Sequence, residues 1–473
     1  MTSAGGIFTV CSVLTLRASS PIRLLWMRSA TSASTAAGVK LRMALATLRC
    51  RPSPSVSRSG HEFGQSVPPT SMSATSRGRF TRVPIIASML RYLTAGESHG
   101  PQLTVIIEGL PSGLEISEDD LRRDLARRQG GHGRGGRQKI ETDFAHIVSG
   151  VRGGFTIGSP VTLVLENKDH VNWTAEMTAS KEGFAPKPVT KLRPGHADLA
   201  GALKYGHTDI RNVLERSSAR ETATRVAAGG VARKLLGHFG IEILSFTQSI
   251  GTIDIGYDGV DPNTVTVEEI EASPVRCPDP EASKRMVADI DEVGEKGDTL
   301  GGTFRIIARG VPLGLGSYVH WDRKLDGRLA QAVLSINAIK AVEFGAGFEG
   351  AARRGSQFHD EIDYQDGRFT HRTNRAGGIT GGVSNGEPID LRVAIKPIST
   401  MKTPLPSIDL NTKEKVQAHY ERSDVCVVPA AGVIGEAVVA LTLADAFLEK
   451  FGGDSMPELE RNHRGYLESI GSL

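Results

Sequence analysis

The sequence predicts an α+β fold. Short apolar, β-branched runs predict strands, and longer runs with apolar residues three or four positions apart predict helices. The two types do not alternate regularly, as they would in a parallel βαβ array. Glycine makes up 54 of 473 residues, about 11%, against an average of about 7%. We therefore expect a globular protein with many backbone-dictated turns and ligand-binding loops.

Four segments have the composition and boundaries of strands. They are rich in β-branched residues and lie beside turn residues: Leu103–Glu108, Pro160–Glu166, Gly302–Ala308 and Ile389–Ile395. In the last segment, apolar side chains occupy every second position from Leu391 to Ile395. This alternation predicts a strand with one buried face.

Four segments have the spacing of amphipathic helices. The first begins at Ser117–Asp120, whose pattern is that of a capping box, and leucines follow on one face. The second begins at Ser218 and ends at Gly240. The other two are expected over Leu325–Ile339 and Ala437–Phe451, the last ended by two glycines.

The first 89 residues differ in composition from the remainder. They hold 11 Lys and Arg but one acidic residue, Glu62, whereas residues 90–473 hold 45 basic and 52 acidic residues, a formal charge of −7. A segment rich in Ser, Thr, Ala and Arg is typical of an organellar transit peptide. We expect a disordered targeting segment over 1–89 and one large domain over 90–473. An uncleaved tail is the alternative for the first segment.

Several partner classes have little support in the sequence. The net charge of +3 arises in residues 1–89, so it is a weak indication of nucleic-acid binding. The apolar run Ile7–Leu16 is too short to span a bilayer, and we identify no longer one. Cys277 and Cys426 lie far apart, and no Cys/His cluster has zinc spacing. We therefore expect no membrane contact, no disulfide framework and no metal.

Two glycine-bearing loops contain the first candidate functional residues. In Gly96–Pro101, a following proline fixes the turn that presents His99, although a solvated turn explains the same residues. In Arg127–Lys139, five cations are separated by glycines. Arginine binds phosphate or carboxylate through two parallel hydrogen bonds, so this loop favours an anion. A solvated loop and an RGG-type RNA-binding segment are the alternatives.

Further segments combine cations, hydroxyls and glycine. Arg193–Asp198 is followed by Arg216–Glu221, where serines precede a predicted helix. Free N–H groups and the helix dipole favour an anion there, and the serines serve equally as helix caps. Gly377–Gly386 allows a ligand to approach the backbone closely. Lys396–Thr400 and Arg422–Asp424 complete the set.

Gly345–Gly350 matches the dinucleotide-binding pattern GxGxxG. Because it follows a predicted helix and not a core strand, its βαβ context is missing, and we set it aside. It is nevertheless the main support for an alternative function, a flavin or nicotinamide oxidoreductase.

Taken in order, these loops resemble those of chorismate synthase over residues 90–473. The matching motifs are Gly96–Pro101, Arg193–Asp198, Arg216–Ala223, Gly377–Gly386, Lys396–Thr400 and Arg422–Asp424. The resemblance implies a β-α-β sandwich, a homotetramer and a catalytic domain over 90–473. It also implies that 5-enolpyruvylshikimate-3-phosphate loses phosphate by 1,4-anti elimination to give chorismate, with reduced FMN required and no net redox change.

The resemblance further implies roles for individual residues. The catalytic residues are His99 beside the leaving phosphate, His196 at the pyrimidine end of the flavin, and Asp424 near flavin N5. The substrate-binding residues are Ser98, Arg128, Arg134, Arg137, Arg193, Ser218, Arg220 and Arg422. The FMN-binding residues are Arg216, Ser217, Ser218, Asn337, Ala338, Gly381, Lys396, Pro397, Ile398, Ser399, Thr400 and Arg422. We expect the cations to gather in one basic cleft.

The remaining expectations concern cofactor supply and location. We expect NADPH to act only indirectly, through a separate flavin reductase, because no appended reductase domain is recognisable. The transit-like N-terminus and the pathway favour the plastid stroma, with the mitochondrion or cytoplasm as alternatives. We expect a small-molecule substrate, no nucleic acid and no membrane.

Overall fold

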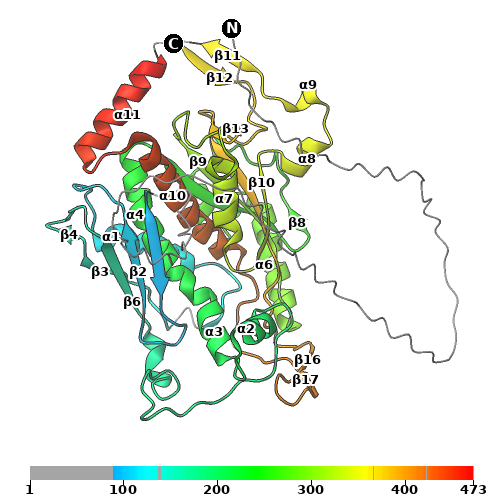
Figure 1. The fold of residues 1–473 in the computed structure, drawn as a ribbon. Helices are drawn as coiled ribbons and strands as arrows, with labels where there is room; N and C mark the ends of the chain where they lie inside the picture. Colours follow the sequence, from blue (N-terminus) through cyan, green and yellow to red (C-terminus); the bar gives the residue numbers. More distant parts are fainter. Residues whose placement is uncertain (1–88, 137–139, 366, 422, 472–473) are drawn as a thin grey trace, which may run out of the picture. The chain divides into compact units, whose positions relative to one another are not determined.

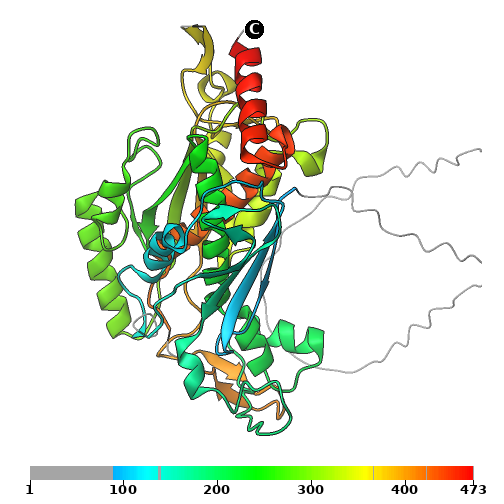
Figure 2. The same ribbon diagram turned by 90° about the vertical axis from the view of Figure 1, so that its left-hand side faces the viewer.

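Two antiparallel sheets lie on opposite sides of a layer of helices (Figures 1 and 2). The structure is a computed structural model that describes residues 89–136, 140–365, 367–421 and 423–471. The predicted targeting segment therefore lies outside the described residues, except for Met89. The layers form the β-α-β sandwich that the resemblance implies, and the predicted α+β class is confirmed.

The first sheet has the strand order β1-β2-β6-β3. Its strands are β1 (Arg91–Ala95), β2 (Gln102–Glu108), β6 (Val161–Glu166) and β3 (His146–Ser149). Every second residue of β2 and β6 is buried, which is the pattern of an antiparallel sheet with one face on the core. That face packs against the helical layer.

The second sheet has the order β10-β15-β9-β7-β8. Its strands are β10 (Ile339–Phe344), β15 (Ile389–Ile395), β9 (Gly302–Arg309), β7 (Glu242–Ile250) and β8 (Ile253–Asp254). β7 is buried at every position after Glu242, because both of its faces are covered. The helical layer covers one face, and a cluster containing Val265 and Ile270 covers the other.

Four helices fill the space between the sheets. They are α1 (Glu118–Gln129), α4 (Thr222–His238), α7 (Leu325–Leu334) and α10 (Val428–Phe451). α4 contacts β2 and β6, whereas α10 contacts β7 and β9. Where α4 and α10 cross, a Cβ added to Gly229 would lie 2.4 Å from the Cβ of Ala437. Only glycine allows the two helices to approach so closely.

The remaining elements surround these layers. In Figure 1, α11 (Met456–Gly471) and the hairpin of β11 (Ile362–Gln365) and β12 (Arg368–His371) lie at one end, and α2 lies at the other with the β16–β17 hairpin. The other bounds are β4 (Val151–Arg152), β5 (Phe155–Thr156), η2 (Lys168–Asn172), α2 (Asp198–Tyr205), α3 (Arg211–Ser217), η3 (Ala219–Glu221), α5 (Val267–Glu271), α6 (Pro280–Glu295), η4 (Trp321–Arg323), α8 (Gly347–Ala351), α9 (Gly355–Phe358), β13 (Ile379–Thr380), β14 (Val383–Ser384), β16 (Pro406–Ile408) and β17 (Lys415–Gln417).

The four predicted strands are confirmed to within one residue as β2, β6, β9 and β15. The predicted capping box at α1 is also confirmed. The Ser117 hydroxyl accepts from the Asp120 N–H, and the Asp120 carboxylate accepts from the Ser117 N–H. These elements depend on local chemistry, which the sequence displays directly.

Three predicted helices have different bounds. α7 ends at Leu334, five residues early, because Ala338 adopts φ +67° and Ile339 begins β10. α10 begins at Val428, nine residues early, with Pro429 in the first turn, where its missing N–H costs nothing. Ser218 caps the 3₁₀ turn η3 instead of α4, which begins at Thr222.

The GxGxxG segment follows the strand β10, and not a helix as predicted. However, β10 pairs antiparallel with β15, and the helix after it, α8, has only five residues. A dinucleotide fingerprint requires a parallel βαβ unit with a long helix whose N-terminus faces the pyrophosphate. We therefore still do not assign this segment to dinucleotide binding. The reason is now its antiparallel strand and its short helix, and not a preceding helix.

Helix α10 is long and apolar enough to cross a membrane, by length and composition alone. This corrects the expectation that no segment has that length. In the structure, 89% of its most apolar 18-residue window is buried inside the protein. The hydrophobicity of α10 is thus explained by its position between two sheets.

Candidate active site

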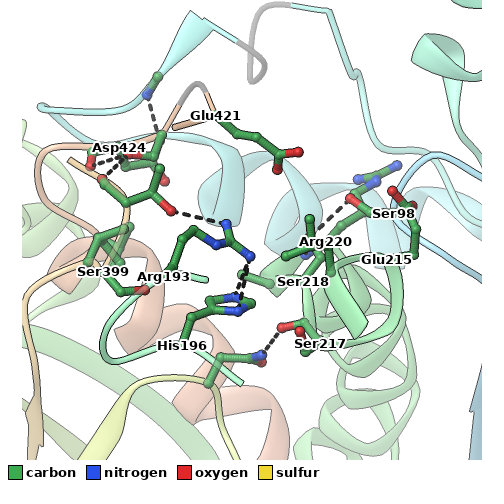
Figure 3. Close-up of a pocket in the computed structure, with 18 of the residues that line it drawn as sticks. Ser98, Arg193, His196, Glu215, Ser217, Ser218, Arg220, Ser399, Glu421 and Asp424 are labelled. Atoms are coloured by element: carbon green, nitrogen blue, oxygen red, sulfur yellow. Dashed lines mark hydrogen bonds between the residues drawn. The ribbon is translucent and has the colours of Figure 1, made fainter. Parts of the chain in front are cut away.

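A cavity of about 1000 Å³ lies among the loops that join these elements. It brings together most of the predicted site residues, although they come from distant parts of the chain (Figure 3). Those that line it are Ser98, His99, Arg128, Arg134, Arg193, His196, Ser217, Ser218, Arg220, Asn337, Ala338, Lys396, Ile398, Ser399, Thr400 and Asp424. Both predicted catalytic imidazoles therefore face one cavity.

The β1–β2 loop holds His99 in the cavity wall, where it is 9% exposed. Glu215 of α3 accepts two hydrogen bonds from this residue, from the backbone N–H and from ring Nδ1, both at 2.8 Å. Trp173 stacks on the imidazole with 4.0 Å between ring centroids. Because Nδ1 and one ring face are occupied, Nε2 is the nitrogen left for a ligand.

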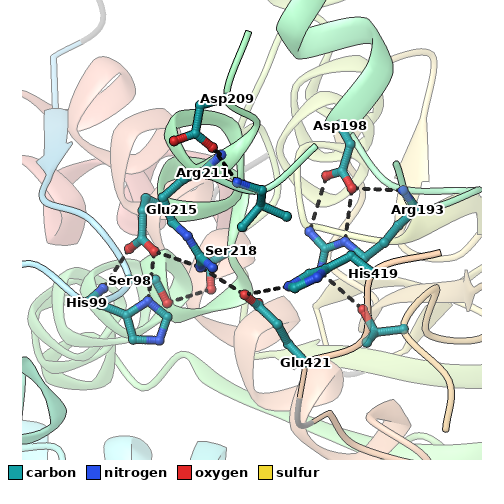
Figure 4. A network of polar contacts seen from close by, with 12 residues as sticks. Ser98, His99, Arg193, Asp198, Asp209, Arg211, Glu215, Ser218, His419 and Glu421 are labelled. Carbon is teal, nitrogen blue, oxygen red and sulfur yellow. Dashed lines mark hydrogen bonds and ion pairs between the residues drawn. The ribbon is translucent and has the colours of Figure 1, made fainter. Parts of the chain in front are cut away.

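Arg211 joins Glu215 to a second carboxylate, Glu421 (Figure 4). Its Nη1 lies 3.5 Å from Glu215 Oε1 and 2.8 Å from Glu421 Oε1. Burial alone would raise the pKa of Glu421, but the hydrogen bond with His419 and the charge of Arg211 lower this pKa to about 2. Glu421 is therefore ionised at neutral pH.

His196 belongs to a second polar cluster. Its Nδ1 lies 2.5 Å from Asp198 Oδ1, and Arg193 Nη2 lies 3.0 Å from the same ring nitrogen. Arg193 also donates to Thr400 Oγ1 at 3.1 Å. Burial would raise the pKa of Asp198, but hydrogen bonds from His196 and Arg193 lower it to about 2. Arg193 is thus largely engaged within the protein, and its main observed contacts orient His196.

Arg128 and Arg220 form a buried cationic pair around Asp143. Arg128 Nη1 lies 3.3 Å from Asp143 Oδ2, and Arg220 Nη1 donates to Asp143 Oδ1. Burial lowers the pKa of Arg128 to about 10, with the charges of Arg220 and Arg134 adding to the effect and that of Asp143 opposing it. Glu141 Oε2 also lies 3.6 Å from Arg220 Nη2, so two carboxylates balance the two guanidiniums at this part of the wall.

Arg134 and Asp424 face each other across the next part of the wall. Arg134 Nη1 lies 3.4 Å from Asp424 Oδ2, and the Gly135 N–H donates to Asp424 Oδ1 at 2.5 Å. Arg134 Nε is buried and has no hydrogen-bond partner among the residues that the structure describes. A buried unpaired donor is costly, so this nitrogen is suited to a ligand acceptor.

The remaining lining residues are positioned by short-range contacts. Ser98 Oγ donates to Ser218 Oγ at 3.0 Å, and Asn337 Nδ2 donates to the Ser217 carbonyl at 2.9 Å. The left-handed backbone of Ala338 accompanies a hydrogen bond of 3.1 Å from the Lys396 N–H to its carbonyl. Burial, and then the charge of Lys340, lower the pKa of Lys396.

Three predicted FMN-binding residues do not line this cavity. Arg216 donates to the carbonyls of Gly96 and Thr94 at 3.1 and 3.0 Å, which directs its guanidinium to the β1–β2 loop. Gly381 is exposed in the β13–β14 turn, and Pro397 is not in the cavity wall. Two further predictions, Arg137 and Arg422, lie outside the described residues.

The structure adds cavity residues that sequence reasoning did not identify. They include the carboxylates of Glu215 and Glu421, the guanidinium of Arg211 between them, and the ring of Trp173 on His99. Asp143, which holds Arg128 and Arg220, is buried and does not line the cavity. Glu215 directly precedes the Arg216 motif, so its place in the sequence was an available signal. No group of three or more His, Cys, Asp or Glu within the described residues could hold a metal ion.

Comparison with known proteins shows the family of this chain. A sequence profile of the family described as chorismate synthase matches residues 90–448. The chain belongs to the chorismate synthase family. Chorismate synthase of Desulforudis audaxviator is 58% identical over 384 residues, which cover 81% of this chain and 98% of the relative. Chorismate synthase of Geobacter sulfurreducens is 57% identical over 395 residues, covering 81% and 99%.

A solved structure of chorismate synthase shares the fold with a TM-score of 0.66 and 42% identity, covering 81% of this chain and 99% of the solved chain. Chorismate synthases are carbon–oxygen lyases of the shikimate pathway. They act on a small-molecule substrate and use a reduced flavin. This chain is a lyase of that class.

Proposed function

We propose that this chain converts 5-enolpyruvylshikimate-3-phosphate into chorismate and phosphate by 1,4-anti elimination, with reduced FMN bound in the cavity. The observation that supports this most strongly is that His99, His196 and five arginines line a single cavity of about 1000 Å³. The substrate bears two carboxylates and a phosphate, so its binding requires several fixed cations in one place. Arginines spread over separate surfaces could not bind the three anionic groups of one substrate molecule.

The cavity wall fits a flavin mononucleotide. Gly195 has φ +77°, and a Cβ there would lie 3.6 Å from Ser399 Cβ, so the glycine keeps the space beside Ser399 and Lys396 open. Asn337, Ala338 and Lys396–Thr400 would hold the flavin against this open wall. When bound, reduced FMN supplies the electron density that assists cleavage of the C–O bond.

The cations would bind the substrate anions. Arg128, Arg134 and Arg220 would clamp the phosphate and carboxylates, and Ser98 and Ser218 would donate hydrogen bonds. Because no described residue accepts from Arg134 Nε, this clamp has a donor that is available to the ligand. Arg137 and Arg422 stay part of the proposal by family resemblance alone.

The two imidazoles would act on different ligands, one on the departing phosphate and the other on the flavin. His99 would donate a proton from Nε2 to the departing phosphate, or neutralise its growing charge. His196, held by Asp198 and Arg193, would present its ring to the pyrimidine end of the flavin. Asp424 would relay the proton that the elimination releases.

An anaerobic turnover assay tests the proposed function. With catalytic amounts of reduced FMN, the purified chain should give chorismate and phosphate in equal amounts, without net flavin oxidation. Addition of NADPH without a flavin reductase should not replace reduced FMN. Stoichiometric oxidation of FMN or consumption of NADPH would instead favour the alternative oxidoreductase.

We also propose that the chain forms a homotetramer. Four large apolar side chains near η4 and α8 are highly exposed in the single chain: Tyr318 77%, Val319 69%, Trp321 75% and Phe348 79%. Association of several copies of the chain would remove such side chains from water. Sedimentation of the full chain should give four times the chain mass, and a monomeric mass would contradict the proposal.

Organelle import is proposed from the composition of residues 1–89 alone. The two relatives named above are bacterial, which argues against a plastid destination, and about four fifths of this chain corresponds to nearly their full length. A fusion of residues 1–89 to a fluorescent protein tests import directly. Fluorescence in an organelle supports the proposal, whether plastid or mitochondrion, and diffuse cytoplasmic fluorescence contradicts it.

A further inference from the structure

Glu215 contacts the β1–β2 loop at three points. Its carboxylate accepts from both the backbone N–H and ring Nδ1 of His99, each at 2.8 Å, and its backbone carbonyl accepts from the Ser98 N–H at 3.0 Å. The Glu215 side chain is only 3% exposed. Two hydrogen bonds to one carboxylate fix both the backbone and the ring of His99, so the imidazole has one orientation.

These contacts also determine the tautomer of His99. A carboxylate only accepts hydrogen bonds, so Nδ1 must carry a proton to donate to Glu215 Oε1. In the neutral ring the lone pair then lies on Nε2, and in the protonated ring Nε2–H is the proton that a ligand can take. The opposite neutral tautomer would leave Nδ1 facing the carboxylate without a proton.

Neighbouring groups support this geometry. Trp173 stacks on the His99 ring at 4.0 Å, which prevents rotation toward that side. The guanidinium of Arg211 lies 5.0 Å from the centroid of the Trp173 ring, and its Nη1 lies 3.5 Å from Glu215 Oε1. Arg211 thus supplies positive charge near a carboxylate that is otherwise buried.

We propose that Glu215 is a positioning residue that holds His99 as the Nδ1–H tautomer and so presents Nε2 to the cavity. The proposal rests on the proposed function only for its kinetic consequence, because the tautomer can be measured without substrate. Glu215 acts through His99 and is assigned no contact with substrate or flavin.

The isosteric variant Glu215→Gln tests the proposal. The Gln amide keeps one oxygen but has an NH₂ group in place of the other, so one of the two His99 N–H groups would face a donor instead of an acceptor. The backbone N–H of His99 is always a donor, so it keeps the amide oxygen. The ring must then either switch to the Nε2–H tautomer, so that Nδ1 accepts from the amide, or lose its hydrogen bond to residue 215. We expect roughly 10- to 100-fold lower kcat, with KM changed less than about three-fold. Glu221→Gln is the matched control, since Glu221 is buried nearby but binds Thr94 and Arg225 outside the cavity.

Solid-state ¹⁵N NMR of histidine-labelled protein reads the tautomer, and His99→Gln identifies the His99 signals. At about pH 9, where ordinary imidazoles are neutral, wild-type His99 should show protonated Nδ1 and unprotonated Nε2. In Glu215→Gln this pattern should reverse or become mixed, and in Glu221→Gln it should not change. An Nε2–H ring in the wild-type protein, or an unchanged ring in Glu215→Gln, would overturn the proposal even if a variant were unstable.

A double-mutant cycle separates positioning from a general structural role. If Glu215 acts through His99, adding Glu215→Gln to His99→Ala should change turnover by less than about two-fold. An additive loss in the double variant would contradict the proposal. Should the wild-type protein show the expected tautomer but no lyase activity, the proposed function fails while the assignment of the tautomer stands.

Discussion

Arg193 and Asp198 form a buried two-point ion pair, in which Nε and Nη2 of the guanidinium donate to the two carboxylate oxygens at 3.0 and 3.1 Å. The Arg193 backbone N–H also donates to the same carboxylate at 3.0 Å. Asp198 is fully buried, and its second partner is the ring of His196. One carboxylate therefore supports both the fold of this loop and the orientation of a proposed catalytic imidazole.

This pair predicts acid sensitivity. Because the folded state lowers the pKa of Asp198 from 3.8 to about 2, the stabilisation is complete above about pH 4 and is lost as pH falls towards 2. The difference corresponds to about 2 kcal/mol. Asp198→Asn should lower the free energy of unfolding at pH 7 by at least this amount, and the difference should shrink in acid.

Urea unfolding at pH 7, 4 and 3 measures this effect. Glu361→Gln is the control, because Glu361 is 70% exposed in its pair with Arg372, and such surface pairs contribute little. A constant difference between wild type and Asp198→Asn at all three pH values would contradict the linkage.

Loss of the His99 imidazole should affect chemistry and not folding. We expect His99→Ala to lower turnover by about 10²- to 10⁴-fold, the range for a positioned acid–base group. Anaerobic assays of chorismate formation measure the effect, and the control is His238→Ala, whose ring pairs with Glu460 on an exposed surface. Unchanged turnover would remove His99 from the reaction.

Asp424→Asn should slow the proton transfer while leaving FMN binding largely intact. An asparagine can still accept from the Gly135 N–H, so the local backbone is retained, but it loses the charge that faces Arg134. Titration of FMN fluorescence and single-turnover kinetics distinguish the two effects. A variant that no longer binds FMN would show that Asp424 has a structural role instead.

The close contact of α4 with α10 predicts a strong effect of one methyl group. Gly229→Ala should destabilise the protein by about 1–3 kcal/mol, because its Cβ would meet both Ala437 Cβ at 2.4 Å and Ala437 Cα at 2.6 Å. Gly237→Ala in the same helix has open space around it and should stabilise by up to about 1 kcal/mol. Thermal unfolding of both variants checks the prediction, and equal shifts would contradict it.

The elements that sequence reasoning predicted well are those with local signals. From Leu391 to Ile395, β15 alternates buried and partly buried residues, and α1 has its capping box, so neither signal requires knowledge of the tertiary structure. β7 was not predicted because its polar residues Ser245, Thr247 and Ser249 are buried with the rest of the strand. Ser245 is accommodated by Glu436 of α10 at 2.6 Å, a contact 191 residues away in sequence.

In the candidate site, too, the residues with a local sequence signal were predicted, and those that depend on tertiary contacts were not. Motifs rich in Arg, His and Gly indicated its cations and imidazoles, and the structure brings His99 and His196 into one cavity. Glu215 and Glu421 were not predicted, because their partners cannot be read from the sequence, although Glu215 directly precedes the Arg216 motif. Arg216 belonged to a recognised motif, yet it points to the β1–β2 loop, where the carbonyls of Gly96 and Thr94 accept its hydrogen bonds.

Substrate anions and reduced flavin should share the cavity that contains both imidazoles. A crystal structure with FMN and 5-enolpyruvylshikimate-3-phosphate would show whether they do. We expect the phosphate within hydrogen-bonding distance of His99 Nε2, and the flavin pyrimidine ring beside His196. Ligands bound in separate cavities, or His99 Nε2 facing away from the phosphate, would contradict it.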